Sequence, residues 1–354
     1  MQTQSKFRLL VVRLGAMGDI LHALPAVTAL RLAHPNWIID WVVEPRWRPL
    51  FAAEDSLGRV ISCPLVDRLL FAPTKEWRTA PFSEKTHREI KLLRQTLRAG
   101  AYDAVLDLQG AIRSAVVGRL AGCPRLIGEA EPRERPARWL FTERVATRGA
   151  HVIEQDIELA SAIAGDDLRS VQPWLPVDPA AEAWADKILP PASNRNAVLI
   201  NPGAGWGAKR WPTDRYEAVA QGLIDRGLRV LVNAGPGEEP LAEAISRATG
   251  GGATPLSCSL EQLIALTRRA GLVIAGDTGP LHLACALVRP VVGIYGPTDP
   301  SRNGPFGTRF RVLRSPESRR DHTRYSEPEA GLLTIQPEDV LRSASELLAP
   351  ETRP

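Results

Sequence analysis

The sequence predicts an α/β protein with two doubly wound parallel sheets, on three observations. Short apolar runs alternate with longer amphipathic segments along nearly the whole chain, which is the pattern of βαβ units. A proline-rich stretch divides this pattern into two groups. The length of 354 residues leaves room for about two domains of ordinary size.

The candidate strands are short and continuously apolar, which is typical of strands buried in the middle of a parallel sheet. The first group holds expected strands at 7–12, 38–43 and 104–108, and the second group holds them at 197–200, 229–232, 272–275 and 291–294. The segment 335–348 has helical periodicity and opens with Gln336-Pro337-Glu338, so it predicts a helix.

The domain boundaries follow from where proline interrupts the alternation, because proline fixes φ and removes a hydrogen-bond donor. Prolines cluster at both ends of the stretch between the two groups. We therefore expect a first domain at 1–172, a linker at 173–194, a second domain at 195–330 and a C-terminal helical segment at 331–354.

The composition is that of a soluble globular protein, with 44% hydrophobic and 24% charged residues and a net charge of +4. This mildly basic balance is compatible with an anionic substrate or membrane surface, and we expect no nucleic acid as a partner. The four cysteines stand singly, which favours a reducing compartment and no metal site. The apolar run Leu9–Val12 is too short for a signal peptide, so we expect the protein to stay in the cytoplasm.

The first strand leads into a loop that contains Gly15, Gly18 and Asp19. Loops at the carboxyl ends of parallel strands are where open α/β sheets bind ligands. The glycine spacing is G-x-x-G rather than the G-x-G-x-x-G of a dinucleotide fold, which weighs against hydride transfer. Asp19 fits either a reacting carboxylate or a simple helix cap.

Two further loops, both in the second group, have the composition of a phosphate site. Glycines alternate from Gly203 to Gly207 and precede Lys209, a pattern that suits bound phosphate but also an ordinary surface loop. Asp277, Thr278 and Gly279 fall where a helix should begin, so free N–H groups there would favour an anion. The same residues also fit plain caps, and His282 fits a core histidine.

Several common kinds of site are missing from the sequence. It contains no Asp-x-Asp string, no Walker loop, no cluster with metal-ligand spacing and no G-x-S-x-G elbow. What remains is an acidic residue in the first group and phosphate-compatible loops in the second. That combination suits group transfer from a nucleotide-activated donor, bound mainly by the second domain, to an acceptor bound by the first.

A set of segments, in order along the chain, resembles the ADP-heptose:lipopolysaccharide heptosyltransferases of glycosyltransferase family 9. These segments are Arg13–Pro25, Trp41–Glu44, Tyr102–Gly110, Lys209–Pro212, Gly276–Gly279 with His282, and Tyr295–Pro300. The early ones look most like heptosyltransferase I. The resemblance implies a GT-B fold, with two Rossmann-like domains facing each other across a cleft and a C-terminal helix returning to the first domain. It also implies inverting transfer that needs neither metal nor cofactor.

The resemblance also assigns roles to residues. It makes Asp19 the general base and gives Lys209 the donor phosphates, so these two are the catalytic candidates. The donor-binding candidates are Gly203, Ala204, Gly205, Lys209, Glu238, Cys258, Asp277, Thr278, Gly279 and His282. The acceptor-binding candidates are Gly18, His22, Lys75, Arg78, Gln109 and Arg113.

The implied partners are ADP-L-glycero-D-manno-heptose as donor and a lipid A-linked Kdo sugar as acceptor. A lipid-linked acceptor implies peripheral contact with the anionic inner membrane, for which the Arg and Lys residues of 75–98 and Arg133, Arg135 and Arg138 are candidates. Ala204-Gly205 stands where heptosyltransferase I has a Thr pair, and Pro202–Ala204 looks more like heptosyltransferase II. Another donor and a later core acceptor therefore stay open. A nucleotide-sugar epimerase and a non-catalytic nucleotide-sugar-binding protein of the same α/β class also stay open.

Overall fold

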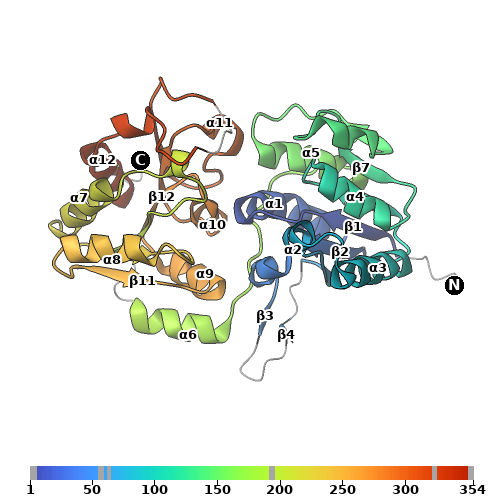
Figure 1. The fold of residues 1–354 in the computed structure, drawn as a ribbon, viewed down its shortest axis with the longest axis horizontal. Coiled ribbons are helices and arrows are strands. Elements are labelled where there is room, and N and C mark those ends of the chain that lie inside the picture. Colours follow the sequence, from blue (N-terminus) through green and yellow to red (C-terminus); the bar gives the residue numbers. More distant parts are fainter. Residues whose placement is uncertain (1–5, 55–59, 62–64, 191–195, 321–324, 350–354) are drawn as a thin grey trace. The chain divides into compact units, whose positions relative to one another are not determined.

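The computed structural model describes residues 6–54, 60–61, 65–190, 196–320 and 325–349. The chain divides into two compact units, and it passes from the first to the second between Pro176 and Val177. Each unit has its own sheet and its own helices, and each is described by itself (Figure 1).

The first unit is built on a six-stranded parallel sheet. Its strands are β1 (Arg8–Val12), β2 (Ile38–Val43), β5 (Arg68–Phe71), β6 (Ala104–Asp107), β7 (Leu126–Glu129) and β8 (Glu143–Val145), and they lie in the order β5-β2-β1-β6-β7-β8. A small antiparallel pair, β3 (Ala53–Glu54) and β4 (Val60–Ile61), interrupts the connection from β2 to β5. The helices are α1 (Met17–Ala33), α2 (Thr74–Thr79), α3 (Glu84–Ala99), α4 (Ile112–Leu120) and α5 (Val152–Ala164).

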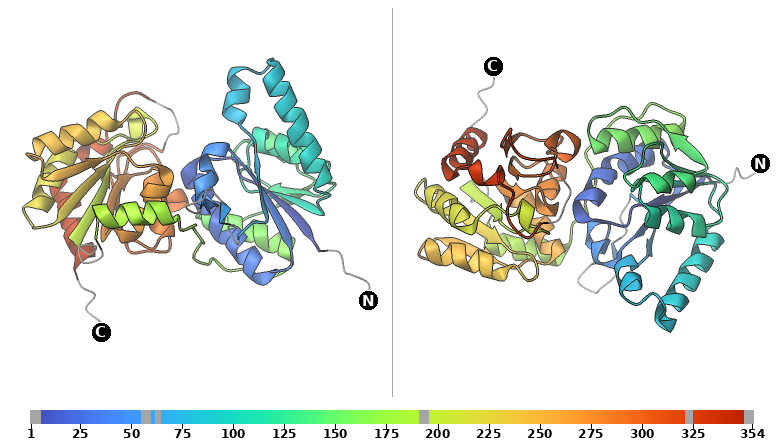
Figure 2. Two further views of the ribbon diagram at one scale, coloured as in Figure 1. Left: turned by 90° about the horizontal axis from the view of Figure 1, so that it is seen from below. Right: turned by 45° about the horizontal axis from the view of Figure 1, so that its top comes forward.

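The second unit repeats this plan. Its strands are β9 (Ala197–Asn201), β10 (Arg229–Asn233), β11 (Ala253–Leu256), β12 (Leu272–Gly276), β13 (Val291–Tyr295) and β14 (Phe310–Arg314), all parallel in the order β11-β10-β9-β12-β13-β14. The helices are α6 (Pro179–Ile188), α7 (Thr213–Ile224), α8 (Glu239–Ala248), α9 (Leu260–Arg269), α10 (Gly279–Ala286), α11 (Pro300–Asn303) and α12 (Pro337–Leu348). Helices lie on both faces of each sheet (Figure 2).

Strand order fixes where each unit can bind a ligand. Counted along the chain within each six-stranded sheet, both sheets have the order 3-2-1-4-5-6, the doubly wound order of dinucleotide-binding folds. The order reverses between the first and fourth strands, and folds of this kind bind ligands beyond the carboxyl ends of those two strands. These switch points lie between β1 and β6 in the first unit and between β9 and β12 in the second.

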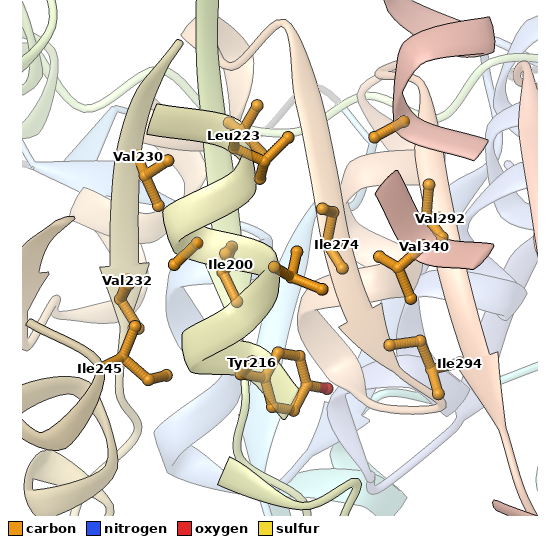
Figure 3. Close-up of a cluster of buried hydrophobic side chains, with 14 of the residues drawn as sticks. Ile200, Tyr216, Leu223, Val230, Val232, Ile245, Ile274, Val292, Ile294 and Val340 are labelled. Carbon is orange, nitrogen blue, oxygen red and sulfur yellow. The ribbon is translucent and has the colours of Figure 1, made fainter. Parts of the chain in front are cut away.

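The core of the second unit shows why these segments form these elements (Figure 3). Ile200, Val232 and Ile274 project from the sheet onto the apolar face of α7. That face carries Tyr216, Val219, Ala220 and Leu223, which have the i, i+3, i+4, i+7 spacing of one side of a helix. In the first unit the corresponding layer packs Leu10, Val12 and Val105 against Leu93 and Leu97 of α3.

The structure confirms the α/β class and all seven predicted strands, to within one residue at each end. Two expectations about segment placement are wrong. Helix α12 does not return to the first domain, because Val340, Ala344 and Leu347 complete the core of the second unit. The segment 173–194 is not all linker, because α6 docks on α9 of the second unit through apolar contacts and through ion pairs of Glu182 with Arg268 and Arg269.

Candidate active site

The loop between β1 and α1 places Asp19 at the switch point of the first unit. Asp19 lies in the first turn of α1, and its carboxylate Oδ2 accepts a hydrogen bond from the backbone N–H of Ala16 at 3.1 Å. Asp19 therefore takes part in capping α1, but it is not the N-cap residue. The N-cap residue is Ala16, and Asp19 accepts the hydrogen bond of its amide. The side chain keeps 33% of its surface exposed, so the carboxylate is open to a ligand.

Two guanidinium groups flank this carboxylate. Arg13 is buried at the end of β1; its Nε donates to the Asp19 carbonyl at 3.0 Å and its Nη2 lies 3.6 Å from Oδ1. Arg133 approaches from the segment after β7, with Nη1 3.7 Å from Oδ2. No sequence spacing connects Arg13 or Arg133 with Asp19, so Arg13 is missing from the predicted site and Arg133 is predicted at a membrane surface instead.

The neighbouring loop, between β6 and α4, supports the β1–α1 loop. The side-chain oxygen of buried Gln109 accepts a hydrogen bond from the backbone of Leu14 at 2.8 Å. Asp107 shapes the turn by accepting from the amides of Gln109 and Gly110, both at 2.8 Å, and burial raises its pKa to about 6. Gln109, an acceptor-binding candidate, therefore has a clear structural role in holding the two switch-point loops together.

The other acceptor-binding candidates lie in two places, on helix α1 and in a cluster of basic side chains. Gly18 lies in the first turn of α1 beside Asp19 and is partly exposed, whereas His22 is buried with its ring edge-on to His151 at 5.6 Å. Lys75, Arg78 and Arg113 belong to a cationic cluster that also contains Arg46. Partial burial and then the charge of Arg46 lower the pKa of Lys75, with smaller effects of Arg113 and Arg78 in the same direction. The charge of Glu44, which is paired with Arg46 at 2.6 Å, opposes them.

The switch point of the second unit holds a compact group of three polar side chains, Lys209, Asp277 and His282. Lys209 donates from Nζ to Asp277 Oδ2 at 2.5 Å, and His282 Nε2 lies 3.1 Å from Oδ1. Burial opposes ionisation of Asp277, but the hydrogen bond with His282 and the charge of Lys209 outweigh it and hold its pKa well below the usual range. The carboxylate therefore fixes the ammonium group of Lys209 at the carboxyl ends of β9 and β12.

The glycine-rich loop after β9 lies against Glu238, the residue that precedes α8. A Cβ atom on Gly203 would stand 1.8 Å from Glu238 Oε2, so the glycine allows the Glu238 carboxylate to lie directly against the loop. Gly205 faces open space, and the carbonyl of buried Ala204 accepts from Arg210 at 3.4 Å. The loop therefore places a carboxylate and a cationic side chain along the same edge of the sheet.

The remaining donor-binding candidates lie at the ends of β11 and β12. Thr278 is the N-cap residue of α10, which begins at Gly279, and no side chain caps that helix within the described part of the chain. The backbone N–H of Cys258 donates to Asn233 at 3.2 Å, and burial raises the pKa of its thiol to about 12, so the thiol is unreactive near neutral pH. The described residues contain no cluster of three His, Cys, Asp or Glu side chains suited to a metal ion.

A family comparison decides the class of protein. The model of "Glycosyltransferase family 9 (heptosyltransferase)" matches residues 90–332. The chain belongs to glycosyltransferase family 9. It is therefore a glycosyltransferase, and the resemblance seen in the sequence motifs is confirmed.

Individual members of family 9 match over most of their length. Lipopolysaccharide heptosyltransferase 1 of Escherichia coli strain K12 is 31% identical over 313 residues, which cover 87% of this chain and 94% of that protein. Lipopolysaccharide heptosyltransferase 2 of the same strain is 27% identical, over 97% of this chain and 99% of that protein. The structure of the E. coli heptosyltransferase WaaC with ADP matches with a TM-score of 0.76 at 28% identity, over 96% of this chain and all of that one.

Proposed function

We propose that this chain transfers a heptose from ADP-L-glycero-D-manno-heptose to the Kdo sugar of a lipid A precursor, as a step in building the lipopolysaccharide core. The observation that carries the proposal is that each unit has suitable chemistry at its own switch point. The first unit presents an exposed carboxylate, Asp19, and the second presents a fixed cation, Lys209. The relatives named above act as lipopolysaccharide heptosyltransferases, and one of them was solved with ADP.

In this mechanism Asp19 takes the proton from the attacking acceptor hydroxyl. The acceptor oxygen forms a bond to the anomeric carbon from the face opposite the diphosphate, the bond from that carbon to the phosphate oxygen breaks, and ADP leaves. One base suffices for inversion, because no glycosyl-enzyme intermediate forms. Arg13 and Arg133 hold the carboxylate in place through the contacts described above.

The donor is bound by the second unit in this proposal. Lys209 neutralises charge that gathers on the leaving diphosphate, the electrostatic role that a metal ion fills in other transferases. The N-terminus of α10 adds backbone N–H groups and a partial positive charge at Thr278 and Gly279. Glu238 lies beside the glycine loop, where it is suited to hydrogen-bond hydroxyl groups of the nucleoside.

The acceptor is bound by the first unit. Kdo carries a carboxylate and lipid A carries phosphates, and the cluster of Lys75, Arg78, Arg113 and Arg46 offers several cations to such groups. A lipid-linked acceptor also places the enzyme at the cytoplasmic face of the inner membrane. The structure has no helix long and apolar enough to span a membrane in its described residues, so the contact we propose is peripheral.

The Asp19→Asn variant tests the base directly. Asparagine keeps the shape of the side chain and still accepts the hydrogen bond from Ala16, so we expect the fold and the affinity for ADP to be unchanged. Loss of the base should lower kcat by about 10²- to 10⁴-fold. The measurement is transfer from ADP-heptose to a Kdo-terminated acceptor, run with EDTA present, in which we expect the wild type to keep its full rate.

The exposed Asp167→Asn is a matched control and should have wild-type kcat. Turnover of Asp19→Asn at the wild-type rate would remove Asp19 from the mechanism, and loss of wild-type activity in EDTA would show that a metal ion is required.

A second acceptor is favoured by one observation. The donor loop, with Pro202–Ala204 and Ala204-Gly205, looks more like that of heptosyltransferase II. The relative of that type, lipopolysaccharide heptosyltransferase 2, matches over 97% of this chain. The alternative function is transfer of heptose to an existing core heptose. Parallel assays with acceptors that end in Kdo and in heptose distinguish the two, since only the acceptor of the correct step should be consumed.

A further inference from the structure

The corner between α2 and α3 is a rigid turn with no apolar cover. The backbone N–H of Ser83 donates to the Ala80 carbonyl at 3.2 Å, and the hydroxyl of buried Thr86 donates to the same carbonyl at 2.8 Å. The Ser83 hydroxyl caps α3 by accepting from the Thr86 amide at 3.1 Å. These bonds fix Ala80–Ser83, so whatever the turn carries is held in one position.

This rigid turn presents Phe82 to solvent. Its side chain is 92% exposed, although burying a phenylalanine is among the larger gains available to any residue. Leu92, on α3, is also 63% exposed. Figure 2 (left) shows the α2–α3 hairpin projecting beyond the sheet of its own unit.

The charge of the same hairpin identifies the kind of partner. Residues 74–99 contain seven Lys or Arg residues and three Glu residues, a net charge of +4 that equals the net charge of the whole chain. Leu93 and Leu97 pack into the core, and the rest of the helix exposes its cations, namely Lys85, Arg88, Lys91, Arg94 and Arg98. Lys85, Arg88 and Leu92 share one face by helical spacing. An aromatic side chain next to a cationic helix face is typical of proteins that lie on anionic bilayers.

We propose that the α2–α3 corner docks on an anionic lipid bilayer, with Phe82 inserted among the headgroups and acyl chains and the cations of α3 beside the lipid phosphates. This rests on the proposed function, in which the acceptor is anchored in lipid. Each basic residue near an anionic surface adds attraction that salt weakens, and the inserted ring adds an apolar part that salt does not weaken. The corner would thereby hold the first unit at the surface where its acceptor lies.

The test is flotation of the full chain with vesicles of phosphatidylglycerol and phosphatidylethanolamine that contain no acceptor. We expect wild type to float at low salt, to float less at high salt and not to bind vesicles of phosphatidylcholine alone. Phe82→Ser should weaken partition by about tenfold or more, because the ring no longer enters the bilayer. Leu32→Ser is the matched control, because Leu32 is 61% exposed on α1, and its partition should equal that of wild type.

A second pair of substitutions tests the charged part. Lys85→Gln with Arg88→Gln, both on the face that carries Leu92, should reduce both partition at low salt and its dependence on salt. Wild-type protein that fails to float with anionic vesicles, or Phe82→Ser that floats as well as wild type, would overturn the proposal. Transfer of heptose to a water-soluble acceptor fragment separates the docking proposal from the proposed function. Phe82→Ser should keep the wild-type rate on that fragment, whereas wild type should be inactive on it if the proposed function is wrong.

Discussion

Each unit contains a buried aspartate, Asp156 in the first and Asp277 in the second, and the two differ in how their surroundings affect their charge. Asp277 is held ionised by Lys209 and His282, so its negative charge serves to position a cation. Asp156 on α5 is as deeply buried, but its Oδ2 has no hydrogen-bond partner among the described residues. Burial raises the pKa of Asp156 to about 7, and the attraction of Arg13 offsets only part of this. Asp156 is therefore neutral below neutral pH and becomes charged just above it.

The raised pKa of Asp156 predicts that the stability of the fold depends on pH, and that substitution of Asp156 removes this dependence. An aspartate in an unfolded chain titrates near pH 4, so between about pH 4 and 7 the unfolded state ionises while folded Asp156 stays neutral, and stability falls as pH rises. The loss is about 1.4 kcal/mol for each pH unit that separates the two pKa values. Asp156→Asn, which cannot ionise, should unfold at a higher temperature than wild type at pH 8 and at nearly the same temperature at pH 4.

Thermal unfolding followed by circular dichroism across this pH range measures the effect. The exposed Asp167→Asn should follow wild type throughout. A difference between Asp156→Asn and wild type that is the same at pH 4 and pH 8 would contradict the assigned titration.

Sequence patterns found the residues of the second switch point better than those of the first. Lys209, Asp277 and His282 lie in strings that follow strands and resemble a known family, so each was a candidate before its partners were known. Arg13 and Arg133 are 120 positions apart, and Arg46 precedes Lys75 by 29 positions. No spacing rule connects such pairs, because only the folded sheet brings them to one carboxylate or into one cluster.

Among the elements, the loop from β9 to the short 3-10 helix at Gly207–Lys209 gives the sharpest test of geometry. Gly203→Ala would force Glu238 away, since the new Cβ would overlap its carboxylate. A flexible side chain can move at little cost, so we expect Tm to change by no more than a degree or two while the affinity for ADP falls. The control is Glu243→Gln, which changes a side chain that is 62% exposed on α8 and should leave ADP binding unchanged.

Calorimetric titration of ADP into both variants measures the effect. Equal ADP affinity of Gly203→Ala and Glu243→Gln would show that the position of Glu238 does not matter for the nucleotide.

Which elements the sequence predicted depends on how deeply each is buried. The seven predicted strands lie in the middle of the sheets and are almost wholly apolar, so their runs stand out. Five strands of the two six-stranded sheets were missed. Strands β5, β8 and β14 carry exposed arginines or glutamate within the run, β11 contains a proline, and β7 is buried but has an apolar run of only Leu126 and Ile127 before Gly128. These strands owe their conformation to pairing with a neighbour rather than to an apolar pattern of their own. The same limit applies to α12, whose periodicity predicts a helix but does not say which core it completes.

At the scale of the whole molecule, the two units have separate cores. In the described residues, α12 packs on the sheet of the second unit and α6 packs on helix α9 of the same unit. The boundary at Pro176 leaves each unit with a complete doubly wound sheet. Separate cores allow separate unfolding transitions, since the free energy of each depends mainly on its own burial. If the second unit alone binds the nucleotide, ADP should stabilise one transition and leave the other unchanged.

Differential scanning calorimetry with and without ADP tests this division. At 100 times its Kd a ligand stabilises the state that binds it by about 2.7 kcal/mol, which is about 5–10 °C for a unit of this size. Leu223→Ala removes a core side chain of the second unit at a cost of about 2–5 kcal/mol and so identifies its transition. ADP should raise that transition in wild type and should raise it much less in Lys209→Ala, which lacks the cation proposed to hold the diphosphate. Movement of the other transition would instead place the nucleotide against the first unit, because a ligand stabilises only the state that binds it.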